Sequence, residues 1–240
     1  NLRRKGLYDV YANKNAKVYE QVIEQIKTMI ISGNLQKGDK LPSERELVDQ
    51  LKVSRTSIRE ALRALEIVGL IKCKQGEGNF IRDNFDNSLF EPLSLVFMLE
   101  KSNKEDIIEV RRIIEVEAAA LAAKRITKEQ LKKLEYIIDE IKNSEDEKIL
   151  VKLDKNFHYE IAQASNNFIL LNIINSCSTL IDSLIQNARY KIKIMENFDN
   201  KKELLDQHEK IYLALKEKDS KLASKLMNEH LEFSEKFLGM

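Results

Sequence analysis

The three histidines of this 240-residue chain fall at positions where they could act together as metal ligands. His158, His208 and His230 each lie on the apolar side of a helical pattern, so we expect all three imidazoles to point into a core. Asp154 precedes His158 by four residues, which puts a carboxylate and an imidazole one turn apart on the same helix face. Three imidazoles and one carboxylate form a suitable set for one divalent ion. Imidazole-rich ligation favours zinc or nickel, and manganese fits if water completes six coordination.

The same four residues could also serve a structural role or a catalytic one. Buried histidines are usually hydrogen-bonded core residues, and an Asp-His pair at this spacing is often only a salt bridge. Buried polar groups cost several kcal/mol unless they are compensated, however, and one shared cation would compensate all four. A metal with open positions would also suit a hydrolase or isomerase. Glu160 and Glu209 point about 100° away from the ligands beside them, and no GxSxG motif occurs, so an enzyme is the less favoured alternative.

Arg111 is a further candidate, because it falls on an apolar helical stripe where a guanidinium group is unusual. The stripe consists of Ile107, Val110, Ile114, Ala118 and Leu121. A buried arginine needs an anion. Glu115, one turn further along, could supply that anion internally.

The elements that must position these side chains read as helices from residue 89 onward, with no convincing strand. We predict helices at 89–101, 104–124, 128–142, 146–165, 168–195, 202–217 and 220–238. Capping-box spacings at Ser102–Glu105, Thr127–Gln130 and Ser144–Glu147 mark three starts, and Asn166-Asn167, Asn200 and Asp219 mark other breaks. The chain is therefore expected to be mainly α, with a C-terminal all-α bundle of six or seven helices.

The stretch from Leu41 to Phe80 has a different organisation and reads as two short helices followed by a hairpin. Ser43, with Glu46 three residues later, starts the first helix, and Ser54 starts the second, which Gly69 ends. The apolar positions of the second helix recur at helical spacing and define its inner face. Three arginines at four-residue intervals, Arg55, Arg59 and Arg63, line its opposite face. Such a row can enter a major groove and meet phosphates or guanine edges.

The hairpin is predicted from two short alternating runs, Ile71–Lys74 and Asn79–Arg82, joined by a turn with two glycines, of which Gly76 lies at the tip. Together with a helix at Val18–Ser32, the order of elements is that of a winged helix-turn-helix.

The motif LPSERELxxxLxVSRTSIREALRxLExxGLI closely resembles the GntR superfamily of bacterial transcriptional regulators. The resemblance implies a winged helix-turn-helix domain that binds operator DNA. It places Arg45, Arg55, Arg59 and Gly76 on DNA-contacting positions, and we add the residues at the two helix starts, Ser43, Ser54 and Thr56, to the predicted DNA-binding set. The alternative for the arginines alone is a solvated basic face paired with Glu60 and Glu66.

The segment DxxFHxxIAxASxN, from Asp154 to Asn167, is similar to that of metal-binding members of the FadR-like branch, whose all-helical FCD-type domain senses a ligand. The resemblance implies that His208 and His230, from the last two helices, complete the metal site. It also puts Arg111 and Glu115, in EVRxxxE, at the effector cavity, where a small carboxylate metabolite could bridge Arg111 and the ion. The alternative is the same regulator without metal, sensing an acyl-CoA-like ligand directly.

Composition agrees with two domains, residues 1–84 for DNA binding and 85–240 for sensing, with residues 1–16 as a possible mobile arm. Residues 1–82 hold 16 Lys/Arg against 10 Asp/Glu, and residues 83–240 hold 24 against 29, so the basic part is the DNA candidate. No signal peptide or membrane span is predicted, and two isolated cysteines fit a reducing cytoplasm. A homodimeric repressor that reads two half-sites is the expected assembly.

Overall fold

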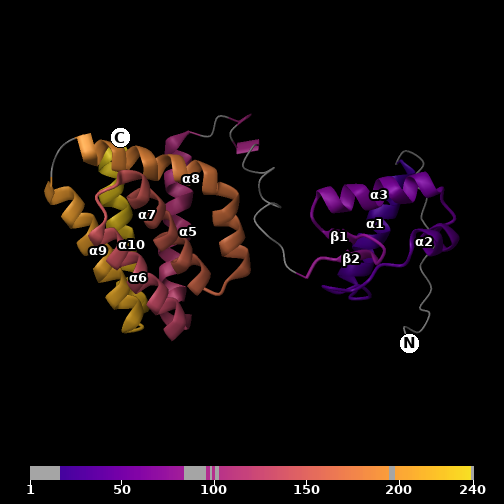
Figure 1. Cartoon of the computed structure of the whole chain (residues 1–240), viewed down its shortest axis with the longest axis horizontal. Coiled ribbons are helices and arrows are strands. Elements are labelled where there is room, and N and C mark those ends of the chain that lie inside the picture. The colour runs from indigo at the N-terminus through magenta and orange to yellow at the C-terminus, as the bar shows by residue number, and fades with distance from the viewer. Residues whose placement is uncertain (1–16, 84–95, 98, 101–102, 195–197, 239–240) are drawn as a thin grey trace. The chain divides into compact units, whose positions relative to one another are not determined.

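The computed structural model describes residues 17–83, 96–97, 99–100, 103–194 and 198–238 (Figure 1). The chain divides into two compact units, residues 1–89 and 90–240. The predicted arm, the predicted boundary at residue 84 and most of the predicted helix at 89–101 lie outside the described residues.

The N-terminal unit is a winged helix-turn-helix, as expected. It contains α1 (Val18–Ile31), α2 (Glu44–Leu51), α3 (Arg55–Ile67), β1 (Ile71–Lys74) and β2 (Gly78–Ile81). Both α1 and α2 pack against α3, and the two strands pair antiparallel with Ile71 opposite Ile81. The buried core joins all of these elements. Its residues are Val22, Ile26, Leu35, Leu41, Leu47, Leu51, Ile58, Ala61, Leu62, Leu65, Ile71 and Ile81.

Side-chain caps set the starts of the two DNA-candidate helices. Ser43 and Glu46 form the predicted capping box of α2, and the Ser54 hydroxyl accepts from the Ser57 amide at the start of α3. In the wing turn Gly76 has φ +77°, a left-handed conformation that glycine adopts without strain. The second strand begins and ends one residue earlier than the sequence predicts.

The C-terminal unit is all-helical, and the described residues contain six α-helices. These are α5 (Lys104–Arg125), α6 (Lys128–Asn143), α7 (Glu147–Ala164), α8 (Phe168–Ile194), α9 (Phe198–Lys216) and α10 (Ser220–Glu235), followed by a 3₁₀ turn at Lys236–Leu238. Helix α5 packs against α7, α8, α9 and α10, and α7 also packs against α6 and α8. The site residues therefore lie on helices that pack around α5 (Figure 1).

Several predicted helix ends differ from those in the structure. Asp146, not Ser144, caps α7, because its carboxylate accepts directly from the Lys148 amide. Helix α5 begins at Lys104, as predicted, and the Asn103 side chain caps it by accepting from the Asp106 amide. The predicted Ser102–Glu105 box includes Ser102, which lies outside the described residues. Helix α9 begins at Phe198, so Asn200 lies inside this helix and does not mark a break between helices. The last predicted helix, at 220–238, ends as an α-helix at Glu235 and continues as the 3₁₀ turn.

Helix α8 is the one described helix that is long and apolar enough to cross a membrane by length and composition. Its polar residues have partners within the bundle. Asn172 and Asn175 are buried, and Asp182 forms an ion pair with Lys155 of α7 at 2.7 Å. Because α8 also packs against α5 and α7, we assign it as a helix of the bundle.

Candidate metal centre and nucleic-acid interface

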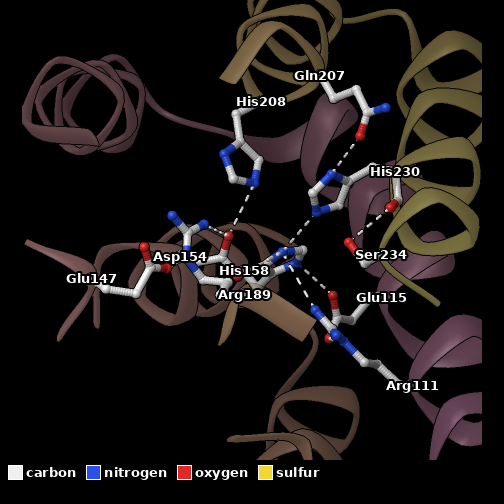
Figure 2. A network of polar contacts seen from close by, with 10 residues as sticks. All are labelled: Arg111, Glu115, Glu147, Asp154, His158, Arg189, Gln207, His208, His230 and Ser234. Carbon is white, nitrogen blue, oxygen red and sulfur yellow. Dashed lines mark hydrogen bonds and ion pairs between the residues drawn. The ribbon is translucent and has the colours of Figure 1, made fainter. Parts of the chain in front are cut away.

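The three histidines come together in the C-terminal unit from three different helices (Figure 2). His158 lies on α7, His208 on α9 and His230 on α10, and one nitrogen of each lies within 4.8 Å of the others. Their exposed fractions are 7%, 0% and 1%, which confirms the prediction that all three point inward. The shortest of these separations joins His158 Nε2 to His230 Nε2, at 3.2 Å.

Neighbouring acceptors fix the tautomer of two of these imidazoles. Glu115 Oε2 lies 2.5 Å from His158 Nδ1, and this carboxylate favours the tautomer with the proton on Nδ1 and a lone pair on Nε2. His230 Nδ1 lies 3.0 Å from Gln207 Oε1. The orientation of the Gln207 amide follows from its Nε2, which donates to Glu203 Oε1 at 2.9 Å and leaves Oε1 to accept from His230.

Two nitrogen lone pairs therefore face one another at the centre of the cluster. Two acceptors at 3.2 Å repel each other unless a cation lies between them. His208 adds a third imidazole, and neither of its nitrogens has a hydrogen-bond partner among the described residues. Nitrogen ligands about 2.0 to 2.1 Å from one zinc ion lie about 3.3 Å apart in a tetrahedral site, so this donor set fits a divalent ion.

The surroundings keep His208 and His230 neutral, which is the form that binds a metal. Burial lowers the pKa of His208 to about 3, although Asp154 opposes the shift. Burial also lowers the pKa of His230 well below its ordinary value, and the cations around it act in the same direction.

Asp154 lies beside two of the three histidines. Its Oδ1 is 3.6 Å from His208 Nε2, and its Oδ2 is 3.9 Å from His158 Nε2. The compact cluster consists of the histidines alone, because Asp154 is held by Arg189 of α8, whose Nη1 donates to Oδ1 at 3.1 Å. Burial would raise the pKa of Asp154, but Arg189 and the histidines outweigh it and lower that pKa.

Arg111 is buried, as the sequence predicts, and it pairs with Glu115. The Nε of Arg111 donates to Glu115 Oε1 at 2.8 Å, and its Nη2 lies 3.5 Å from His158 Nε2. Burial opposes ionisation of Glu115, but Arg111 and His158 outweigh it and lower the pKa of that carboxyl to about 2. Both Glu115 oxygens thus hold other site residues, one Arg111 and the other His158.

A small cavity adjoins this cluster. Its volume is about 20 Å³, which is room for about one or two water molecules. Its polar wall includes Arg111, Asp154, Arg189 and Ser234. Its apolar wall is formed by Ile108, Ile185, Ala188, Leu204, Leu231 and Leu238.

The sequence did not identify Arg189, Glu147 or Gln207 as site residues. Arg189 donates through Nε to Glu147 Oε1 at 3.0 Å as well as to Asp154. A signal for Arg189 was present, because it follows Ile185 by one turn on an apolar face, as Arg111 does on its own helix. The partners of Gln207 and Glu147 lie on other helices, and no local spacing indicates them.

The candidate nucleic-acid interface is the outer face of α3 with the wing. Arg55, Thr56 and Arg59 are exposed there, and so is Arg45 on α2. A groove of about 690 Å³ runs along this face and includes Cys73 of β1 and Asn79 of β2. Arg59 pairs with Glu44 at 2.9 Å, and not with Glu60 or Glu66 as the alternative supposed. The hydroxyls of Ser43 and Ser54 make cap hydrogen bonds, and Gly76 is exposed at the wing tip.

Comparison with known proteins identifies both units. Residues 18–81 match the family described as bacterial regulatory proteins, gntR family, and residues 106–233 match the FCD domain. The HTH-type transcriptional regulator LutR of Bacillus subtilis is 34% identical over 204 residues, which cover 85% of this chain and 93% of LutR. The "Putative L-lactate dehydrogenase operon regulatory protein" of Escherichia coli is 33% identical over 218 residues, 89% of this chain and 83% of that protein.

A solved structure, Streptococcus agalactiae GntR, has a TM-score of 0.64 at 28% identity and covers 91% of this chain and 99% of its own. With the two domain matches, these similarities agree with the winged unit and the helical unit described above. The chain therefore belongs to the GntR family of bacterial regulators that carry an FCD domain, and it is a DNA-binding transcriptional regulator, not an enzyme.

Proposed function

We propose that this protein is a metabolite-responsive repressor whose helical unit binds one divalent metal ion and a small carboxylate effector. The observation that carries the proposal is the meeting of His158 Nε2 and His230 Nε2 at 3.2 Å, each with its other nitrogen held by an acceptor. Such a site is preorganised for a cation. His208 and Asp154 complete the proposed ligand set, with zinc or nickel favoured and manganese compatible.

Operator DNA would be read by the exposed face of α3. Arg55 and Arg59 are proposed to enter the major groove, and Arg45 and the wing tip at Gly76 to contact the backbone. Ser43 and Ser54 would act through the helix starts that they cap, with Thr56 beside the second start. We propose that the protein works in the cytoplasm, where it would meet operator DNA.

A short carboxylate fits the proposed effector site. Arg111 would bind the carboxylate beside the metal, and Glu115 would hold both Arg111 and His158 in place. A cavity of about 20 Å³ is far too small for an acyl-CoA chain, which favours a short effector over a long one. Because one relative is named for an L-lactate dehydrogenase operon, L-lactate is the first effector to test.

We also propose that the protein acts as a homodimer. Helices α5 and α8 pack together and carry exposed apolar side chains, including Ile113, Phe168 and Ile169, which are 65%, 57% and 70% exposed. An apolar surface of this kind suits contact with a second copy. Two recognition helices related by a twofold axis would then read two half-sites.

The test is a DNA-binding assay with defined metal content. Protein purified without chelator is analysed for bound metal, and its affinity is measured for a duplex that it selects from a random pool. We expect about one ion per chain and weaker DNA binding when L-lactate or another short carboxylate is added. The proposed metal site is contradicted if the purified protein contains no metal and added zinc, nickel or manganese does not change its melting temperature.

A further inference from the structure

Arg189 is the second guanidinium group of the cavity, and its position raises the question of what it does there. It lies on α8, is 7% exposed, and lines the cavity together with Arg111. In Figure 2 the two arginines flank His158 on either side. Each is paired with acidic residues, Arg111 with Glu115 and Arg189 with Asp154 and Glu147.

The guanidinium group of Arg189 is only partly used by these contacts. Its Nε donates to Glu147 and its Nη1 to Asp154. No hydrogen bond from its Nη2 is found in the part of the chain that the structure describes. Because a guanidinium group carries five N–H donors in a fixed plane, Arg189 can hold Asp154 and still donate to a ligand in the cavity.

The charges around the cavity are balanced only when a metal and an anion bind together. Three carboxylates (Glu115, Asp154 and Glu147) and two guanidinium groups (Arg111 and Arg189) leave a net charge of −1 when the histidines are neutral. Lys201 lies 4.0 Å from Glu147 but is exposed to solvent, so only the buried charges are counted. Glu235 also lines the cavity, but it forms an ion pair with Arg112. A divalent ion would change the net charge to +1, and one carboxylate would then bring it to zero.

Arg189 also opposes the metal when no anion is present. Asp154 Oδ1 receives the Arg189 hydrogen bond at 3.1 Å and lies 3.6 Å from His208 Nε2. An ion bound by these two residues would therefore lie close to a positive charge in a buried site, where repulsion is poorly screened. A carboxylate between the ion and the arginine would remove that repulsion.

Building on the proposed metal and effector site, we propose that Arg189 is a second effector-binding residue that makes metal and carboxylate bind cooperatively. Arg189 would hold Asp154 for the ion and donate Nη2 to the carboxylate. Since linkage is reciprocal, the carboxylate must strengthen metal binding as much as the metal strengthens carboxylate binding. The favoured ligand is a monocarboxylate, because a dicarboxylate would leave an excess negative charge.

The experiment is a metal titration of the full-length protein by calorimetry, with zinc or manganese chloride. The titration is made alone and with acetate, L-lactate or succinate, and acetamide serves as the neutral control. For the wild type we expect acetate or L-lactate to tighten metal binding at least fivefold, within the usual allosteric range of about 5- to 150-fold. Acetamide should have no effect, and succinate a smaller effect than the monocarboxylates.

Variants then assign the effect to Arg189. In Arg189→Gln the carboxylate effect should fall below about twofold, while the metal still binds alone at least as tightly as in the wild type because the repulsion is gone. Arg189→Lys should recover much of the effect. The matched control is Lys191→Gln, which removes an exposed positive charge two residues away on the same helix and should behave like the wild type.

Arg189→Gln leaves Glu147 and Asp154 without their partner, and the unpaired buried carboxylates could destabilise the fold. A second variant therefore tests whether the carboxylate effect is lost when the buried charges remain balanced. Glu147→Gln with Arg189→Gln removes one charge of each sign and should also lose the carboxylate effect. The inference is overturned if metal binds and either variant keeps the wild-type effect, or if no monocarboxylate changes metal affinity in the wild type. A wild type that binds no metal overturns the proposed function itself, and the inference with it.

Discussion

In the metal-free protein we expect the buried histidines to make stability fall between pH 7.5 and 5.5. The pKa of His208 is about 3 in the folded state, against an ordinary value of 6.5, mainly because burial disfavours its charged form. Between these values the unfolded chain binds a proton that the folded chain does not. The stability from this group is therefore complete above pH 6.5 and is lost as the pH falls toward 3.

The size of the effect follows from linkage. Lowering the pH from 7.5 to 5.5 costs about 1.4 kcal/mol for one histidine that protonates only when unfolded. The pKa of His230 is also lowered by burial, so its protonation in the unfolded chain adds to this loss of stability. The pKa values of Asp154 and Glu115 are lowered too, but their contribution is lost nearer pH 4, outside this interval.

The assay is urea denaturation at pH 7.5, 6.5 and 5.5 with a chelator present, followed by circular dichroism at 222 nm. His208→Leu replaces the imidazole by an apolar side chain in the same core. Its loss of unfolding free energy over this pH range should be about 1.4 kcal/mol smaller than that of the wild type. The reasoning is refuted if His208→Leu and wild type show the same pH dependence.

Three further outcomes are expected. Arg55→Ala and Arg59→Ala should each abolish tight binding to the selected duplex with an unchanged melting curve, and a wild-type shift in a gel-mobility assay would reject the recognition-face assignment. Arg111→Met should keep DNA binding and metal content but weaken the response to L-lactate by on the order of 1.5 to 3 kcal/mol, and an unchanged titration would restrict Arg111 to its pair with Glu115. His208→Ala should lose the metal and the effector response together, and chelation should lower the melting temperature of the wild type but not of this variant.

Local signals predicted the helices better than they predicted the contacts between them. The Ser43–Glu46 and Thr127–Gln130 capping boxes are both formed, because each depends only on residues one turn apart. The Ser144–Glu147 box was wrong. Polar residues follow one another from Ser144 to Asp146, and the spacing alone could not decide which of them caps the helix.

The candidate site was predictable where helix faces determine it. An apolar stripe places His158, His208 and Arg111 inward, and burial of all three agrees with that prediction. The sequence could not indicate that Arg189 lies against Asp154, 35 residues away. A helical pattern indicates which face is buried, but it does not indicate which neighbouring helix that face meets.

The chain of hydrogen bonds from Glu203 through Gln207 to His230 has a consequence for the heat of metal binding. It holds the His230 proton on Nδ1, away from the metal-facing Nε2. At neutral pH neither His230 nor His208 has a proton to lose from its binding nitrogen, because burial has already lowered both pKa values. Metal binding should then release almost no protons from these two residues. In phosphate-free buffers of high and low ionisation enthalpy, these two residues should then contribute almost no buffer-dependent heat.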